Sequence, residues 1–186
     1  MSDYFNMEIE VDLANQASMD KLSKKLHDFP NRIERARVAA IAELETRIVD
    51  RLIKELTLLG LGGSNLASSI EIVRVRDGII INMGAEYAMY VEFGTGLVGA
   101  NNPHPNPSFN GEDWEYDVNE HGEKGWWYPT TADDPNPTKK YSASEDMWFA
   151  KTKGMPARPF MYNTWRYSRL IITKTFNKHL RRELAR

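Results

Sequence analysis

The feature that most constrains the fold is a long amphipathic pattern between residues 31 and 59. Apolar side chains recur there at spacings of three, four or eight residues, which places them on one face of an α-helix. The members of this stripe are Ile33, Ile41, Leu44, Ile48, Leu52, Leu56 and Leu59. The glycine-rich segment that begins at Gly60 is typical of a helix end. Such a helix has to bury its stripe against a sheet or another helix, which the rest of the chain must supply.

Two elements are predicted before this helix. Residues 7–13 alternate between apolar and acidic side chains, which indicates a strand with one solvent-exposed face. A first helix follows, and Asn15 or Ser18 can cap its start. Proline is tolerated in the first turn of a helix but disrupts its interior. We therefore expect Pro30 to interrupt this helix and a second helical segment to begin near Asn31.

Three elements are predicted after the long helix. Two β-branched runs flank Asp77-Gly78, a dipeptide that favours a type I′ hairpin turn. Residues 86–94 form a short helix that ends at Gly94, with apolar residues that anchor it on the sheet: Tyr87, Tyr90, Val91 and Phe93. A C-terminal helix begins at Pro159 and presents one apolar face: Met161, Trp165, Ile172, Phe176 and Leu180.

Residues 96–156 are predicted to be an insertion, either a loop or a β-hairpin arm. Within it, residues 113–118 and 125–130 can pair as a hairpin, and residues 146–152 can add a third strand. Four tryptophans would form a small core at its root, and aromatic side chains exposed beyond that core would mark a partner surface. These tryptophans are Trp114, Trp126, Trp127 and Trp148.

The predicted fold class is therefore α+β, in a single domain that spans residues 1–186. A small, mainly antiparallel sheet packs against one long helix and a C-terminal helix, and a Trp-rich β insertion is attached to it. No helix alternates regularly with the strands, so a doubly wound parallel sheet is not expected.

The search for catalytic chemistry gives little. The chain has no cysteine, which excludes disulfides, thiolate metal sites and cysteine nucleophiles. The turn from Gly60 to Ser64 lacks the lysine of a phosphate-binding loop, and no serine lies in a nucleophile elbow. His104 and His121 lie among acidic residues without a metal-ligand spacing, so solvated loop positions are expected for both. A hydrolase with paired carboxylates stays open, although no pair stands out. We predict no enzyme, no cofactor and no metal.

Charge is divided along the chain, although the formal net charge is only −2. From Arg158 onward the chain is basic, with Arg181 and Arg182 near its end, whereas residues 112–146 are rich in acids. Copies with two such poles could associate head to tail. The basic helix could alternatively contact DNA phosphates. No stretch approaches the roughly 20 apolar residues that a membrane span needs, so we expect no membrane partner.

Two segments on either side of the insertion resemble one known family. The first is YAMYVEFGT, with Tyr87, Ala88, Tyr90, Val91, Glu92, Phe93, Gly94 and Thr95. The second is GMPARPF, with Gly154, Pro156, Ala157, Pro159 and Phe160 as its matching residues. Together they are similar to the tail-completion or head–tail joining family of long-tailed phages, typified by gene product ten of HK-97-type phages.

The resemblance implies a structural protein of the virion neck or tail. It would act as a head–tail connector or tail-completion protein, and it would bind neck and tail proteins and further copies of itself. It implies a homo-oligomeric ring, with six copies as the expected number on the virion, and a chain that can be monomeric in solution. It also implies residence in the host cytoplasm during assembly.

Glu92 is the motif residue that raises a physical question, because a carboxylate among aromatic side chains is costly unless it is paired. Our hypothesis is an ion pair with Arg158 that closes the base of the insertion. Two alternatives stay open: Glu92 faces solvent, or it contacts a neighbouring copy.

Overall fold

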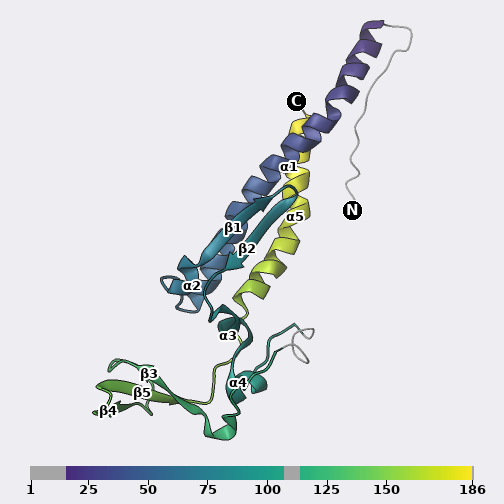
Figure 1. Ribbon diagram of the computed structural model, residues 1–186. Coiled ribbons are helices and arrows are strands. Elements are labelled where there is room, and N and C mark those ends of the chain that lie inside the picture. Colours follow the sequence, from purple (N-terminus) through teal and green to yellow (C-terminus); the bar gives the residue numbers. More distant parts are fainter. Residues whose placement is uncertain (1–15, 107–113, 186) are drawn as a thin grey trace. The chain divides into compact units, whose positions relative to one another are not determined.

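The computed structural model describes residues 16–106 and 114–185 (Figure 1). The predicted strand at residues 7–13 lies outside the described residues, as do Asn15, Glu112, Asp113 and Arg186. The described residues divide into two compact units: residues 16–46 with 170–185, and residues 47–106 with 114–169. We call these unit 1 and unit 2. The prediction of a single domain over residues 1–186 stays a prediction.

Unit 1 is a pair of antiparallel helical segments. They belong to α1 (Gln16–Leu58) and α5 (Phe160–Leu184). Small side chains at Ala36 and Ala40 are buried in unit 1. Polar contacts join the two segments: the Arg35 Nε donates to the Glu183 carboxylate at 3.0 Å, and the Lys178 Nζ donates to Glu43 at 2.6 Å.

The predicted interruption at Pro30 is wrong, because α1 runs without a break from Gln16 to Leu58 and contains Pro30 in its interior. Proline removes one backbone hydrogen bond and crowds the preceding turn, at a cost of about 3 kcal/mol. An ion pair at spacing i, i+4 spans the site: the Arg32 Nε donates to the Asp28 carboxylate at 2.9 Å. Such a pair contributes about 0.3–0.5 kcal/mol, far less than this cost, so it does not by itself account for the continuous helix.

The hydrophobic core lies in unit 2. It is formed by Leu52 and Leu56 of α1, Leu66 of α2 (Asn65–Ser68), Ala88 and Val91 of α3 (Ala88–Phe93), and Phe160 of α5. The hairpin of β1 (Ile70–Val75) and β2 (Gly78–Met83) packs against it through Ile70, Ile81 and Met83 (Figure 1). These contacts confirm the predicted α+β class, with a small antiparallel sheet packed on the long and the C-terminal helices.

The predicted hairpin is confirmed, but its turn lies one residue earlier. Val75 pairs with Gly78, so the turn residues are Arg76 and Asp77. Neither Asp77 nor Gly78 has a positive φ, which a type I′ turn requires at both central positions. The dipeptide thus indicated a turn correctly, but it did not set the turn type.

The predicted apolar face of α5 is also displaced. Phe160, Thr164, Ile171 and Thr175 are buried, whereas Trp165 and Ile172 are 50% and 45% exposed. The threonines were missed because the apolar pattern omits them. A helical threonine can be buried when its hydroxyl bonds a carbonyl of the preceding turn, and the Thr164 hydroxyl donates to the Phe160 carbonyl at 2.8 Å.

The insertion carries a second sheet, with β5 (Met147–Thr152) between β3 (Trp126–Thr130) and β4 (Lys140–Ser142). The strand expected over residues 113–118 is wrong, because residues 114–118 form no strand. β3 instead pairs with β5 in an antiparallel register. Before this sheet, the insertion also contains α4 (Gly96–Asn101) and a short 3-10 helix (Gly122–Lys124).

The four tryptophans do not form one small core. Trp126 and Trp148 are partly buried on the sheet, but Trp127 is 41% exposed. Trp114 packs elsewhere, on Phe93 of α3, with ring centroids 5.0 Å apart. In the described part of the chain, no helix combines the length and the apolar character that crossing a membrane requires.

Candidate functional site

The two motif segments meet in the structure, although they are about sixty residues apart in the sequence. Thr95 and Met155 form an antiparallel bridge in which each backbone N–H donates to the other residue's carbonyl, at 2.9 and 3.1 Å. The Arg158 N–H donates to the Val91 carbonyl at 2.9 Å. We call residues 91–95 together with 154–162 the motif junction. The junction closes the base of the insertion.

Two motif glycines are required by close backbone approach at the motif junction. Gly154 has φ 106°, and a Cβ added to it would lie 1.8 Å from the Thr95 carbonyl oxygen. Gly94 has φ 82°, and a Cβ there would lie 2.6 Å from the Ala157 nitrogen. Side-chain-bearing residues rarely adopt such φ values. The predicted glycine end of the short helix is therefore confirmed, and its second cause is the close approach of the backbone at residues 155–157.

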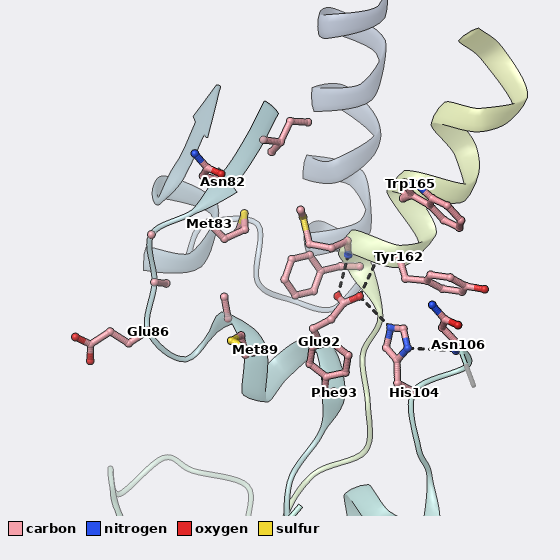
Figure 2. A pocket seen from close by; sticks show the side chains of 16 residues that line it. Asn82, Met83, Glu86, Met89, Glu92, Phe93, His104, Asn106, Tyr162 and Trp165 are labelled. Atoms are coloured by element: carbon pink, nitrogen blue, oxygen red, sulfur yellow. Dashed lines mark hydrogen bonds and ion pairs between the residues drawn. The ribbon is translucent and has the colours of Figure 1, made fainter. Parts of the chain in front are cut away.

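Glu92 caps the start of α5 from another part of the chain. Its side chain accepts hydrogen bonds from the backbone N–H groups of Met161 and Tyr162, both at 2.9 Å (Figure 2). These N–H groups lie in the first turn of α5, where a helix has no acceptors of its own and where its dipole favours an anion. Glu92 is 7% exposed. Both oxygens of this buried carboxylate therefore accept hydrogen bonds from the first turn of α5.

The proposed ion pair between Glu92 and Arg158 is wrong. Among the described residues, the side-chain partner of Glu92 is His104, whose Nε2 lies 3.1 Å from Glu92 Oε1, within hydrogen-bond distance. Arg158 contributes its backbone N–H to the motif junction. The alternative that Glu92 faces solvent is also wrong, since the side chain is buried. Contact between Glu92 and a neighbouring copy stays untested.

His104 is the residue of this site that the sequence reading missed. It was expected in solvent but is only 1% exposed. The Asn106 N–H donates to its Nδ1 at 3.2 Å, which leaves the Nε2 proton to be donated to Glu92. The ring also packs against Phe93 and Tyr162, with centroids 4.9 and 5.1 Å away. The proline-rich loop around His104 gave no signal of burial.

Some aromatic residues of the first motif pack against other side chains, and others are exposed to solvent. Phe93 contacts both His104 and Trp114, and the Trp114 Nε1 donates to the Gly94 carbonyl at 3.0 Å. Tyr87 and Tyr90 were expected to anchor α3 on the sheet, but they are 39% and 43% exposed. Val91 belongs to the core cluster as expected, together with Ala88, which was not predicted. A helix of six residues has too few inward positions for all four predicted anchors.

An apolar cavity of about 710 Å³ lies in unit 2, next to the Glu92–His104 pair (Figure 2). We call it the α3–α5 cavity. Its apolar lining includes Ile81, Met83, Met89, Phe93, Met161 and Trp165. The volume lies within the range of ligand and anchor-residue clefts, about 300–1,000 Å³. The polar atoms of Glu92 in its wall are already engaged by N–H groups and by His104.

Two arginines flank the aromatic wall of this cavity. Tyr162 and Trp165 stack with centroids 5.7 Å apart. The Arg166 guanidinium lies 5.9 Å from the Tyr162 ring centroid, and that of Arg169 lies 4.9 Å from the Trp165 centroid. Cation–π contacts of this kind hold a guanidinium over a ring while its N–H groups stay available. The site offers an apolar hollow beside positive charge.

No group of three His, Asp or Glu residues is placed to hold a metal ion in residues 16–106 and 114–185. Comparison of the chain with protein-family models, with curated proteins and with solved structures found no match in any of the three.

Proposed function

We propose that this chain is a structural protein of a phage neck or tail, a head–tail connector or tail-completion protein that assembles into a ring through protein–protein contacts. The motif junction is the single observation that carries the proposal. The segments that resemble the phage family are bonded to each other in one site, so the resemblance describes a three-dimensional unit rather than two separate short matches.

The surface supports a binding role. Large apolar side chains are exposed at the α3–α5 cavity, including Met89 at 57% and Trp165 at 50%. Apolar groups gathered on one surface are typical of sites that a partner covers. A ring would cover them with neighbouring copies, and the virion would supply the remaining partners.

The test is genetic and structural. Phage particles made without this chain are expected to show filled heads that lack joined tails, and a tagged copy is expected at the neck or tail end in electron micrographs. Particles with normal necks and full infectivity in the absence of the chain would contradict the proposal.

The alternative is a DNA-binding or DNA-processing protein that uses α5. Arg181 and Arg182 are exposed in its last turn, as that alternative needs. A gel-shift assay at near-physiological salt and a nuclease assay with Mg²⁺ separate the two functions. Tight, salt-sensitive binding or cleavage by the purified chain would favour the alternative.

A further inference from the structure

We propose that the α3–α5 cavity receives the β4–β5 hairpin tip, Tyr141 to Met147, of a second copy of this chain. The inference deepens the proposed function and rests on it, because it names the contact by which copies join. Its supports are the apolar lining of the cavity, the arginines beside it, and the composition of the tip.

The cavity presents apolar groups that solvent reaches. Met89 and Trp165 both line it and are at least half exposed. No residue of β3, β4 or β5 is among those that line it in the described chain. Covering such side chains removes apolar surface from water, which favours association.

Arg166 and Arg169 do not line the cavity, but their positive charges lie over the rings of the lining residues Tyr162 and Trp165. Among the described residues, no carboxylate lies within ion-pair distance of Arg166 or Arg169, whose ring contacts are Tyr162 and Trp165. Glu92 is held by α5 and His104, and Glu86 at the margin points away from the hollow (Figure 2). An incoming acidic group would meet two guanidinium groups.

The hairpin tip has complementary properties. Tyr141 and Met147 are 48% and 42% exposed, and Glu145 and Asp146 are exposed in the turn between them. The tip is held in shape, because Tyr141 pairs with Trp148 across the strands and its hydroxyl donates to the Asp146 carboxylate. Asp146 has φ 50°, as a residue in a tight turn can.

In the proposed contact, the apolar side chains of the hairpin tip enter the apolar α3–α5 cavity. Glu145 and Asp146 of the tip then lie near Arg166 and Arg169 of the other copy. Each copy has one cavity and one tip, so the contact joins unlike surfaces and leaves both ends free for further copies. Such a contact closes into a ring when its rotation permits. A nucleic acid would also be drawn to the arginines, but it would not require the tip.

Because the native chain has no cysteine, engineered cysteines report this contact without background. Met89→Cys and Met147→Cys replace exposed side chains on the two surfaces. Under mild oxidation, a mixture of the two single variants should give a disulfide-linked dimer. The double variant should give a ladder of dimer, trimer and larger species.

Two controls make the result specific. Met19→Cys has a comparable exposure of 37% and lies in α1, so its pairing with Met147→Cys should give no ladder. Arg166→Glu with Arg169→Glu should reduce cross-linking in the Met89/Met147 double-cysteine chain about tenfold, and adding Glu145→Arg with Asp146→Arg should restore it. Restored cross-linking would show that residues 145 and 146 of one copy lie close to residues 166 and 169 of the other.

A Met19 ladder as strong as the Met89 ladder would overturn the proposal, as would charge reversals without effect. A chain found at the virion neck that gives no Met89–Met147 ladder would leave the proposed function standing and refute this contact. A specific ladder from a chain that is absent from virions would support the contact and refute the proposed function.

Discussion

Glu92 acts on α5 as Ser or Asp usually acts on its own helix, but from a segment about seventy residues away. The carboxylate satisfies two N–H donors of the first turn and accepts a third bond from His104. Bonds to a charged group contribute more than neutral ones, about 1.5–3 kcal/mol each. At the scale of single residues, this side chain connects the two motifs.

We expect Glu92→Gln to lower the free energy of unfolding by about 2 kcal/mol, because one amide oxygen cannot replace a carboxylate that accepts three bonds. Urea denaturation followed by fluorescence measures this. A double-mutant cycle should show coupling between Glu92 and His104, and none between Glu92 and Arg158. Coupling to Arg158 alone would contradict the observed geometry.

Gly154→Ala should destabilise the chain by more than about 1 kcal/mol, because a Cβ there meets the Thr95 carbonyl and the φ of 106° disfavours any side chain. Gly63→Ala is the matched control, since a Cβ there has open space and that glycine has no positive φ. The melting temperatures of the two variants, measured by thermal unfolding, give the comparison. Equal melting temperatures would refute the close approach.

Among the elements, α1 is a helix that continues through an unfavourable residue, Pro30. Pro30 stands in its interior, and the Asp28–Arg32 pair spans the weakened turn. Farther along the same helix, Leu52 and Leu56 belong to the core of unit 2. Helix stability in proteins comes mostly from such packing and less from propensity.

Pro30→Ala should therefore strengthen the first half of α1, by up to about 3 kcal/mol locally, because it restores one hydrogen bond and removes a clash. Hydrogen exchange should slow for amides near residues 30–34. Asn31→Ala, an exposed neighbour, controls for propensity alone and should have a much smaller effect. Unchanged protection in Pro30→Ala would mean that the proline costs this helix nothing.

At the scale of the whole molecule, the two compact units are held together internally by different forces. Unit 2 contains the cluster of Leu52, Leu56, Leu66 and Phe160. Unit 1 buries chiefly small or polar side chains and relies on exposed ion pairs such as Glu43 with Lys178. Exposed pairs are individually weak and are screened by salt.

Acid should loosen unit 1. Hydrogen bonds from Lys178 and His179 lower the pKa of Glu43 from 4.5 to about 2. A lowered folded-state pKa contributes stability that is present above pH 4.5 and is lost as the pH falls through about 2. Protection factors of amides in residues 36–46 should fall over that window. Glu43→Gln should reduce this pH dependence and leave the part that belongs to Asp28, whose pKa is lowered by its hydrogen bond from Arg32. An unchanged pH dependence in Glu43→Gln would contradict the role of Glu43.

Periodicity and turn chemistry predict those elements whose cause is local. The stripe from Ile41 to Leu59 predicts its helix, the two β-branched runs predict the hairpin, and Gly94 predicts the end of α3. Each depends on neighbours a few residues away. Local preference did not predict the continuous helix through Pro30, the lack of a strand at residues 114–118 or the buried face of α5, because propensity is only one contribution to which structure a segment adopts.

The sequence by itself determined the α+β class, the long helix and the two motif segments, because spacing along the chain is enough to define them. Only the tertiary structure decided the partner of Glu92, the burial of His104 and the meeting of the motifs. A carboxylate takes whichever donors the fold brings within about 3 Å, and a linear pattern carries no information about which distant donors those are.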